Sequence, residues 1–375
     1  MTNPQVVISG VGLWTPDHTV TNDELVESYN TYAETFNADN AAAIAAGNVL
    51  EKPLSSSEFI EKASGIKSRY VYIKDGILDP ERMTPKIPLR GEDQISDQAE
   101  ISVIAARKAM AAANKTAADI DAVIVSCAYT QRYYPAIAIE VQHALGIEGF
   151  GFDMLVACSA ATFALQRAYE MVVAGTARSV LVINPELTSP QNNFRDRDSH
   201  FIFGDVATAT IVEKAETCNS DHSYEILDMK AATVFSNNIR SNLGYMVNAN
   251  DDNPFREYNY FHQQGRKVFK EVCPLAASHI QANVEAAGIE VGDVKRWWLH
   301  QANINMNQLI AKKLLGRVPD NKEAPTVLDT YANTASAGSL ISFNLNHEDL
   351  EAGDYGVLCS FGAGYSIGSM VLRKR

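Results

Sequence analysis

Several features are missing from this 375-residue sequence, and each absence excludes a class of protein. No run of about 18 apolar residues occurs, so we expect no membrane-spanning helix. Basic residues are scarce: 32 Lys and Arg stand against 45 Asp and Glu, and the formal net charge is −13. This argues against nucleic acid as a partner, because a phosphate backbone is bound by clustered basic residues. No CxxC, HExxH or clustered His and Cys spacing occurs, so we predict neither a metal site nor a bound cofactor.

Cysteine is also scarce, and the N-terminus lacks a signal sequence. The first five residues lead directly into the apolar segment Val6–Gly10, without the charged and apolar regions of a signal peptide. An odd number of widely spaced cysteines suits a reducing compartment better than a disulfide framework. We therefore predict a cytoplasmic protein. The five cysteines are Cys127, Cys158, Cys218, Cys273 and Cys359.

What the sequence does contain is an internal repeat. Residues 113–125 and 287–299 both run from a helix end through a turn carrying Asp into an apolar strand, at an offset of 174. Residues 175–183 resemble 353–361 in pattern, and 207–212 resemble the closing strand 368–372. Any αβ protein alternates helix, turn and strand, so pattern alone leaves chance similarity open. A duplication predicts two halves of the same topology.

The two predicted halves are residues 1–215 and 216–375, each with the order strand, helix, strand, strand. Amphipathic helices are expected over 97–113 and 264–287, so the fold class is α/β with stacked layers of helix and sheet. Two polar stretches interrupt the first half. These predicted insertions are residues 29–59, helical over 29–47, and residues 74–94.

Each half also has a helix of small residues, over 158–164 and 335–341, and these align at an offset of 177. A pseudo-twofold axis would bury the two helices back to back with their N-termini close together.

Cys158 is placed as a reactive thiol would be. A short buried strand is expected over 152–157 and an alanine-rich helix over 159–174, with Cys158 at their junction. Free backbone N–H groups and the positive end of the helix dipole there favour a thiolate. Taken alone, Cys158 is better explained as a small buried hydrophobic residue, and its partners elsewhere in the chain decide against that interpretation.

Two polar residues end segments that the repeat brings to the same point. His300 follows the predicted strand 296–299 and corresponds to Ser126 in the first half. Asn333 lies just before the second small-residue helix, two residues ahead of the position that matches Cys158. A thiol nucleophile needs a proton acceptor, and acyl transfer needs donors to a developing oxyanion. The three residues together predict acyl-transfer chemistry.

Three other features of the sequence resemble functional sites, but we reject each of them as one. Gly364–Gly368 matches GxSxG, but too few residues follow Ser366 to supply the acid and histidine of a hydrolase. Gly10-Val-Gly12 lacks a third glycine in register for a dinucleotide site. Cys359 lies in a predicted strand, and we interpret it as a core residue.

As a set, five motifs resemble the β-ketoacyl-[acyl-carrier-protein] synthase III family, which has the thiolase fold. The resemblance covers nearly the whole chain and implies duplicated βαβαβ halves in an αβαβα arrangement. The motifs are Ala157-Cys-Ser-Ala160, Phe203-Gly-Asp205, His300-Gln-Ala-Asn303, Tyr331-Ala-Asn-Thr-Ala-Ser336 and Phe361-Gly-Ala-Gly-Tyr-Ser-Ile-Gly368.

The resemblance implies that Cys158 takes an acyl group from acyl-CoA as a thioester. His300 and Asn333 would then bind the thioester carbonyl of malonyl-acyl carrier protein (malonyl-ACP) during loss of CO₂ and Claisen condensation. Backbone N–H groups of Cys158 and Ala363 would bind the oxyanions. Ala363 is a departure, since the family usually has glycine there; backbone donation survives this change.

Further contacts follow from the resemblance alone. Phe59, Arg197 and Asn303 would contact CoA. Tyr134 would reach across a homodimer interface to floor the partner's acyl pocket. Ala63 and Asn305 depart from the family's usual basic residues. The acidic acyl carrier protein would dock on a basic patch, which the resemblance assigns to Lys270, Lys312 and Lys313.

The insertions suggest a primer longer than acetyl, and we expect a medium-chain acyl-CoA. A same-fold acyltransferase that moves an acyl group to an amine or hydroxyl without condensation is the enzymatic alternative. A catalytically silent subunit is the non-enzymatic one, although it would have no chemical need to keep Cys158, His300 and Asn333.

Overall fold

The computed structural model describes residues 4–241 and 260–375. The strands are β1 (Val6–Trp14), β2 (His18–Thr21), β3 (Ser68–Val71), β4 (Ala122–Cys127), β5 (Phe150–Leu155), β6 (Ser179–Glu186), β7 (Val206–Lys214), β8 (Tyr224–Ser236), β9 (Ile239–Arg240), β10 (His262–Gln263), β11 (Val294–Leu299), β12 (Tyr355–Gly362) and β13 (Gly364–Lys374). The helices are α1 (Asn22–Asp39), α2 (Ala41–Ala45), α3 (Ser57–Ser64), α4 (Asp97–Ala112), α5 (Ile137–Leu145), α6 (Ala160–Ala174), α7 (Gly265–Ala286), α8 (Ile304–Leu315), α9 (Leu328–Tyr331) and α10 (Gly338–Leu345).

The large sheet has the strand order β11-β12-β13-β8-β1-β7-β6-β4-β5. Strands β1 and β8 meet through only two residue pairs, Val7 with Glu225 and Ile8 with Tyr224, so the sheet divides there into two parts. In one part β4 and β6 are parallel while β7 and β1 follow antiparallel. In the other, β11 and β12 are parallel while β13 and β8 follow antiparallel. The two parts therefore share one topology.

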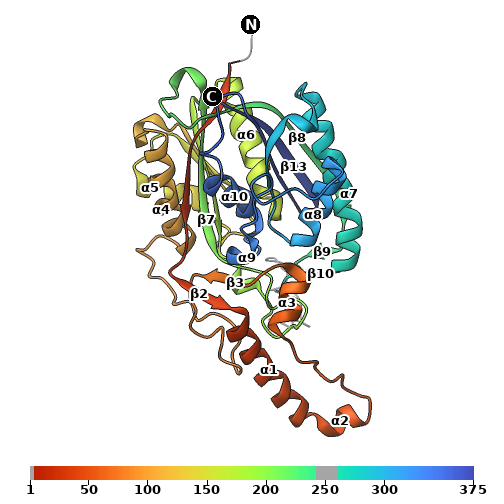
Figure 1. Cartoon of the computed structure of the whole chain (residues 1–375). Coiled ribbons are helices and arrows are strands. Elements are labelled where there is room, and N and C mark those ends of the chain that lie inside the picture. Colours follow the sequence, from red (N-terminus) through yellow and green to blue (C-terminus); the bar gives the residue numbers. More distant parts are fainter. Residues whose placement is uncertain (1–3, 242–259) are drawn as a thin grey trace.

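Five layers result, with α6 and α10 in the middle (Figure 1). A core cluster joins these two helices to strands from both parts of the sheet. A second cluster packs α4 and α5 on the outer face of β4, β6 and β7. A third packs α7 and α8 on the outer face of β11, β12 and β13. The predicted layered α/β arrangement, with small-residue helices buried back to back, is confirmed; small side chains let the two helices approach closely.

The repeat is visible in the turns as well as in the strands. Helices α4 and α7 end at Ala112 and Ala286, and 3-10 turns over Ala117–Asp119 and Val291–Asp293 follow them, 174 residues apart. Each turn is closed by its aspartate in a capping box. We retain the division into halves 1–215 and 216–375 as a proposal.

The offset predicted for the central helices is wrong by one residue. Both α6 and α10 are preceded by a 3-10 turn, over Ala157–Ser159 and Ala335–Ala337. The first residue of each turn has a positive φ, 45° at Ala157 and 46° at Ala335, so the turns match at an offset of 178. Ser336, not Ala335, is therefore the counterpart of Cys158.

Strand β5 also differs from its prediction. It spans Phe150–Leu155 instead of 152–157, and it is half-exposed instead of buried, with Phe150, Phe152 and Leu155 at 41%, 36% and 55% exposure. The cause is its place at the end of the sheet, where it pairs only with β4. Apolar composition predicted a buried strand but could not show that one edge lacks a neighbour.

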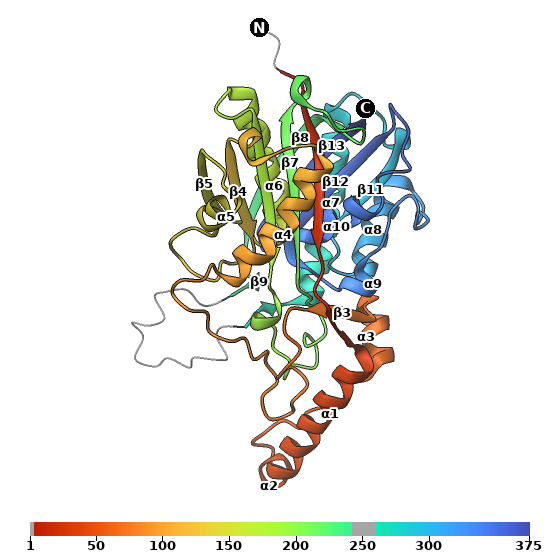
Figure 2. The ribbon, with the colours of Figure 1, turned by 90° about the vertical axis from the view of Figure 1, so that its left-hand side faces the viewer.

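The first insertion forms an arm that extends from the body (Figures 1 and 2). Its helix α1 begins at Asn22, seven residues before the predicted start, because Thr21 and Glu24 form a capping box. The second insertion, residues 74–94, contains neither helix nor strand.

Within the described residues, no helix is long and apolar enough to cross a bilayer.

Gly10 and Gly12 have a packing role in β1. A Cβ at Gly12 would lie 2.2 Å from the carbonyl oxygen of Ala105, and one at Gly10 would lie 2.3 Å from that of Ala109. The glycines therefore allow α4 to lie directly on β1, which accounts for them without a dinucleotide. Cys359 is buried in β12, as predicted for a core residue, and Ser366 lies within strand β13.

Candidate active site

Cys158 is the middle residue of the 3-10 turn Ala157–Ser159, which leads from β5 into α6. The turn is held to the second half of the chain, because the Ser159 hydroxyl donates to the carbonyl oxygen of Ser366 at 2.8 Å. The β12–β13 connection approaches closely: a Cβ on Gly362 would lie 2.7 Å from the Cβ of Cys158. Only glycine leaves room at this point for the nucleophile.

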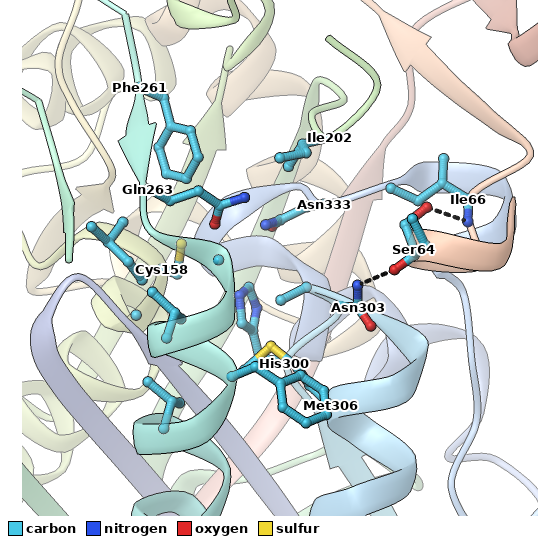
Figure 3. Close-up of a pocket in the computed structure, with 18 of the residues that line it drawn as sticks. Ser64, Ile66, Cys158, Ile202, Phe261, Gln263, His300, Asn303, Met306 and Asn333 are labelled. Atoms are coloured by element: carbon cyan, nitrogen blue, oxygen red, sulfur yellow. Dashed lines mark hydrogen bonds between the residues drawn. The ribbon is translucent and has the colours of Figure 1, made fainter. Parts of the chain in front are cut away.

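Cys158, His300 and Asn333 line one cavity of about 330 Å³ (Figure 3). The structure thus brings together the three residues that the sequence predicted as a group. Most of the remaining wall is apolar: Phe201, Ile202, Phe261, Val268, Phe269, Val272, Met306 and Phe361.

His300 enters the cavity from the end of β11 and is 1% exposed. Its ring packs edge-on against Phe361, with ring centroids 5.1 Å apart. Burial lowers the pKa of His300 to about 3, so the imidazole is neutral near pH 7. A neutral imidazole carries one N–H donor and one unprotonated nitrogen.

Asn333 is fixed by the backbone around it. Its N–H donates to the carbonyl oxygen of Ile202 at 2.9 Å, and its own carbonyl accepts from Gly204 N–H at 3.1 Å. The side-chain Oδ1 accepts from Ala335 N–H at 2.9 Å. The amide group points into the cavity, which leaves Nδ2 as a donor toward a ligand (Figure 3).

The predicted thiolate character of Cys158 is wrong, because the thiol is buried. Burial, together with a smaller effect of the nearby Glu186 carboxylate, raises the pKa of Cys158 to about 12. The N-terminal position on α6 does not overcome this loss of hydration. The resting nucleophile is a thiol, which must lose its proton during attack.

Sequence reasoning missed Glu186, which is 1% exposed at the end of β6. Its carboxylate accepts from the N–H of Ser336 at 3.2 Å, from the Ser336 hydroxyl, and from the N–H of Ala128 at 3.1 Å. Burial raises its pKa to about 7. The available signal was an acidic residue closing an otherwise apolar strand.

Gln263, on β10, was missed as well. Its side-chain amide points into the cavity beside Cys158 and Asn333 (Figure 3). No pattern in the sequence marks this residue, because β10 is only two residues long.

The residues expected to contact CoA meet near the cavity. Phe59 and Asn303 line it, and the Arg197 guanidinium lies over the Phe59 ring at 3.8 Å. Arg197 Nε also donates to the carbonyl oxygen of Leu54 at 2.7 Å. Asn303 donates from Nδ2 to the carbonyl oxygen of Ala63 at 2.7 Å. The cation and ring are therefore stacked on each other here, with no room for a third plane between them.

Other predicted site residues lie apart from the cavity lining. Lys270 on α7 and Lys312 and Lys313 on α8 are exposed, and within the described chain none of them forms an ion pair with a carboxylate. Tyr134 is 79% exposed and does not line the cavity of its own chain. Ala363 follows Gly362 and is half-buried, and only Gly362 of the two lines the cavity.

Comparison with known proteins places these observations in a family. The family model described as 3-oxoacyl-[acyl-carrier-protein (ACP)] synthase III matches residues 152–233, and the model of its C-terminal part matches residues 284–374. The chain is 54% identical over 349 residues to a beta-ketodecanoyl-[acyl-carrier-protein] synthase of Pseudomonas aeruginosa, covering 93% of this chain and 100% of the relative.

More distant relatives agree. The chain is 29% identical over 324 residues to a beta-ketoacyl-[acyl-carrier-protein] synthase III of Mesorhizobium japonicum, covering 85% of this chain and 91% of that one. The crystal structure of 3-oxoacyl-[acyl-carrier-protein] synthase III from Aquifex aeolicus superposes with a TM-score of 0.76 at 22% identity, over 98% of this chain and 99% of that chain. The structural similarity supports the fold.

Proposed function

This chain belongs to the β-ketoacyl-[acyl-carrier-protein] synthase III family, and we propose that it condenses a medium-chain acyl-CoA with malonyl-ACP in fatty acid biosynthesis. The observation that carries the proposal is the meeting of Cys158, His300 and Asn333 in one mostly apolar cavity. The relative at 54% identity is named for a ketodecanoyl product. Since condensation adds two carbons, octanoyl-CoA is the primer that we propose.

The first step is acyl transfer to Cys158. The thiol sulfur attacks the thioester carbonyl of acyl-CoA, the carbon–sulfur bond to CoA breaks, and CoA leaves as a thiol. The proton of Cys158 must move during attack because its pKa is raised to about 12. The proton ends on the departing CoA sulfur, and the unprotonated nitrogen of His300, in the same cavity, relays it there as the carbon–sulfur bond breaks. Backbone N–H groups of Cys158 and Ala363 are the proposed donors to the oxyanion.

The second step is decarboxylative condensation. We assign His300 and the Asn333 Nδ2 group as donors to the thioester carbonyl of malonyl-ACP. As CO₂ leaves, negative charge develops on that oxygen, and two neutral donors in a site with little water stabilise it. The enolate carbon attacks the acyl-Cys158 carbonyl, the bond from that carbon to the Cys158 sulfur breaks, and the released thiolate takes up a proton from solvent.

Recognition of the two substrates is part of the proposal. The stacked Arg197 and Phe59 lie near the cavity where the CoA nucleotide would bind, and the cation would move off the ring to admit an adenine. Asn303 lines the same cavity. The exposed Lys270, Lys312 and Lys313 supply positive charge on a chain of net charge −13, as an acidic carrier protein requires.

We also propose a homodimer built on the free edge of β5. Its apolar side chains are exposed, and an unpaired strand edge is a template for pairing with a second copy. Tyr134 precedes α5, whose first N–H groups bond Asp153 of β5, so it is placed to reach the partner's acyl site. A cytoplasmic location belongs to the same proposal, as five free cysteines suit a reducing compartment.

Intact-protein mass spectrometry after incubation with acyl-CoAs from acetyl to dodecanoyl tests the first step. We expect an adduct that is fastest with octanoyl-CoA and is lost in Cys158→Ala. The absence of any adduct would reject the mechanism.

Adding malonyl-ACP to the acylated enzyme separates the two enzymatic hypotheses. Release of CO₂ with a β-ketoacyl-ACP product supports condensation, whereas acyl transfer to an amine or hydroxyl without CO₂ supports the alternative. We expect Asn333→Ala to retain acylation and to lose condensation by a factor of about 10² to 10³, as removal of one oxyanion donor does elsewhere. Unchanged decarboxylation in this variant would contradict the role of Asn333.

A further inference from the structure

The duplicated fold contains a second strand-end and turn that match the nucleophile site. Strands β6 and β12 both have eight residues and end at Glu186 and Gly362. The matching 3-10 turns have Ser336 and Cys158 as their middle residues. Each pair joins the two halves: Gly362 leaves space against Cys158, whereas the Glu186 side chain accepts hydrogen bonds from Ser336.

The turn that Glu186 holds is strained. Ala335 has φ of 46° and Ala332 has φ of 56°, both in the left-handed region that residues with a Cβ rarely adopt. These two residues flank Asn333 and its neighbour Thr334. Such a conformation costs about 1–3 kcal/mol per residue and persists only where surrounding contacts fix it.

Two consecutive backbone N–H groups link Glu186 to Asn333. The N–H of Ala335 donates to Asn333 Oδ1, and the N–H of Ser336 donates to Glu186 Oε1. The other carboxylate oxygen of Glu186 accepts from Ala128 N–H, in the segment that leads toward Tyr134. One buried carboxylate thereby connects the Asn333 turn to the end of β4.

We propose that Glu186 is a positioning residue for condensation: its carboxylate fixes the Ala335–Ser336 turn and so orients the Asn333 amide in the cavity. This inference rests on the proposed function, because it concerns the step in which Asn333 stabilises the enolate. It assigns Glu186 no contact with substrate. The charge has a second effect, since it disfavours the thiolate of Cys158.

The groups around Glu186 support an ionised carboxylate at the pH of an assay near 8. Its three partners are all donors as the structure places them. Four titratable groups interact electrostatically with the Glu186 carboxylate, and none of them is a cation. They are Cys127, Tyr129, Cys158 and Asp205. Its pKa is near 7, so the charge is present above that pH and lost below it.

Three variants test the proposal. Glu186→Ala removes both the carboxylate and its bonds to the turn; Glu186→Gln retains the shape and removes the charge; Ser336→Ala retains the charge and removes one bond. Circular dichroism and thermal unfolding verify that each variant is folded. If Glu186→Ala does not fold, Glu186→Gln, which retains the shape of the side chain, is used in its place.

The first readout compares the two half-reactions. Enzyme already acylated on Cys158 is mixed with malonyl-ACP, and CO₂ release is followed in a single turnover. We expect a fall of about tenfold or more in Glu186→Ala and a smaller fall in Ser336→Ala, with partial recovery in Glu186→Gln. The acylation rate should fall less than CO₂ release in all three. CO₂ release at the wild-type rate in both Glu186→Ala and Ser336→Ala would overturn the proposal.

The second readout needs no substrate. Alkylation of Cys158 by iodoacetamide is followed by peptide mass spectrometry from pH 6 to 10. Removing the charge in Glu186→Gln should speed alkylation severalfold at pH 8, because the thiolate of Cys158 is then less disfavoured, whereas Ser336→Ala should leave the profile in place. An unshifted profile in Glu186→Gln would show that the carboxylate is not coupled to the site. If wild-type protein is never acylated by any acyl-CoA, the proposed function fails. The alkylation profile would still measure the electrostatic effect of Glu186 on Cys158, because it needs no substrate.

Discussion

At the scale of single residues, burial sets the protonation state of the candidate active site. His300 is 1% exposed and neutral near pH 7, while Cys158 is a thiol with its pKa raised to about 12. This combination suits a cysteine that reacts with thioesters inside a mostly apolar cavity, because neither group carries a charge that would need hydration at rest. Charge develops only when substrate is present.

The pKa of His300 predicts how stability depends on pH. The folded pKa is about 3, against about 6.5 in an unfolded chain, so only the unfolded state binds this proton between those values. The contribution of His300 to stability is therefore lost as pH falls below about 6.5. Lowering the pH from 7.5 to 5.0 should therefore reduce the unfolding free energy of the wild type by about 2 kcal/mol more than that of His300→Gln.

Urea unfolding of both proteins at the two pH values measures this difference. Comparing the two proteins cancels the other titrating groups, including buried His200 and His347, whose pKa values are also lowered by burial. A difference that does not change with pH would show that His300 is protonated in the folded protein as readily as in the unfolded chain.

At the scale of elements, the close approach of helix to strand depends on small residues. Helix α4 lies on β1 where Gly10 and Gly12 present no side chain, and α6 and α10 meet through short side chains at the centre. The Gly10-Val-Gly12 segment, which resembled part of a dinucleotide motif, therefore serves packing. The sequence of β1 alone does not show that these two glycines face α4.

Substituting Gly12 tests this packing. An added methyl group at Gly12 would meet backbone atoms, the Ala105 oxygen at 2.2 Å and the Ala109 nitrogen at 2.5 Å, so α4 must move away from β1. We expect Gly12→Ala to lower the free energy of unfolding by about 2 kcal/mol. Gly292→Ala is the matched control, since a Cβ there has open space, and it should change stability by less than about 0.5 kcal/mol. Equal stability of the two variants in urea would contradict the close approach.

At the scale of the whole molecule, one end of the sheet is left open. At the other end, β11 is mostly buried and its Trp297 N–H donates to the carbonyl oxygen of Glu323 outside the sheet, whereas β5 exposes Phe150, Phe152 and Leu155. Exposed apolar strand edges are uncommon in isolated chains because they invite further pairing. The open edge is the physical basis for the proposed homodimer.

Light scattering after gel filtration tests the dimer. We expect wild-type protein at twice the chain mass of 41.0 kDa and Phe152→Lys shifted toward a single chain, because a lysine on each edge brings like charges together. Leu89→Lys, at a fully exposed apolar residue in the second insertion, is the control and should remain a dimer. A wild-type chain that runs as a monomer at micromolar concentration would refute the interface.

The sequence by itself determined what depends on local chemistry and on repetition. Apolar periodicity predicted helices α4 and α7 almost to the residue, and the repeat at 174 predicted two matching sets of strands. The motifs around Cys158, His300 and Asn333 identified the three residues that line one cavity. Each is fixed by side-chain pattern along the chain, which a single sequence displays directly.

Only the tertiary structure decided what depends on neighbours distant in sequence. It showed that β5 is an edge, that burial outweighs the helix dipole at Cys158, and that Glu186 bonds Ser336 across 150 residues. The physical reason is the same in each case. Hydration, electrostatic potential and hydrogen-bond partners belong to the space around a group, and that space is formed when both halves of the chain pack around α6 and α10.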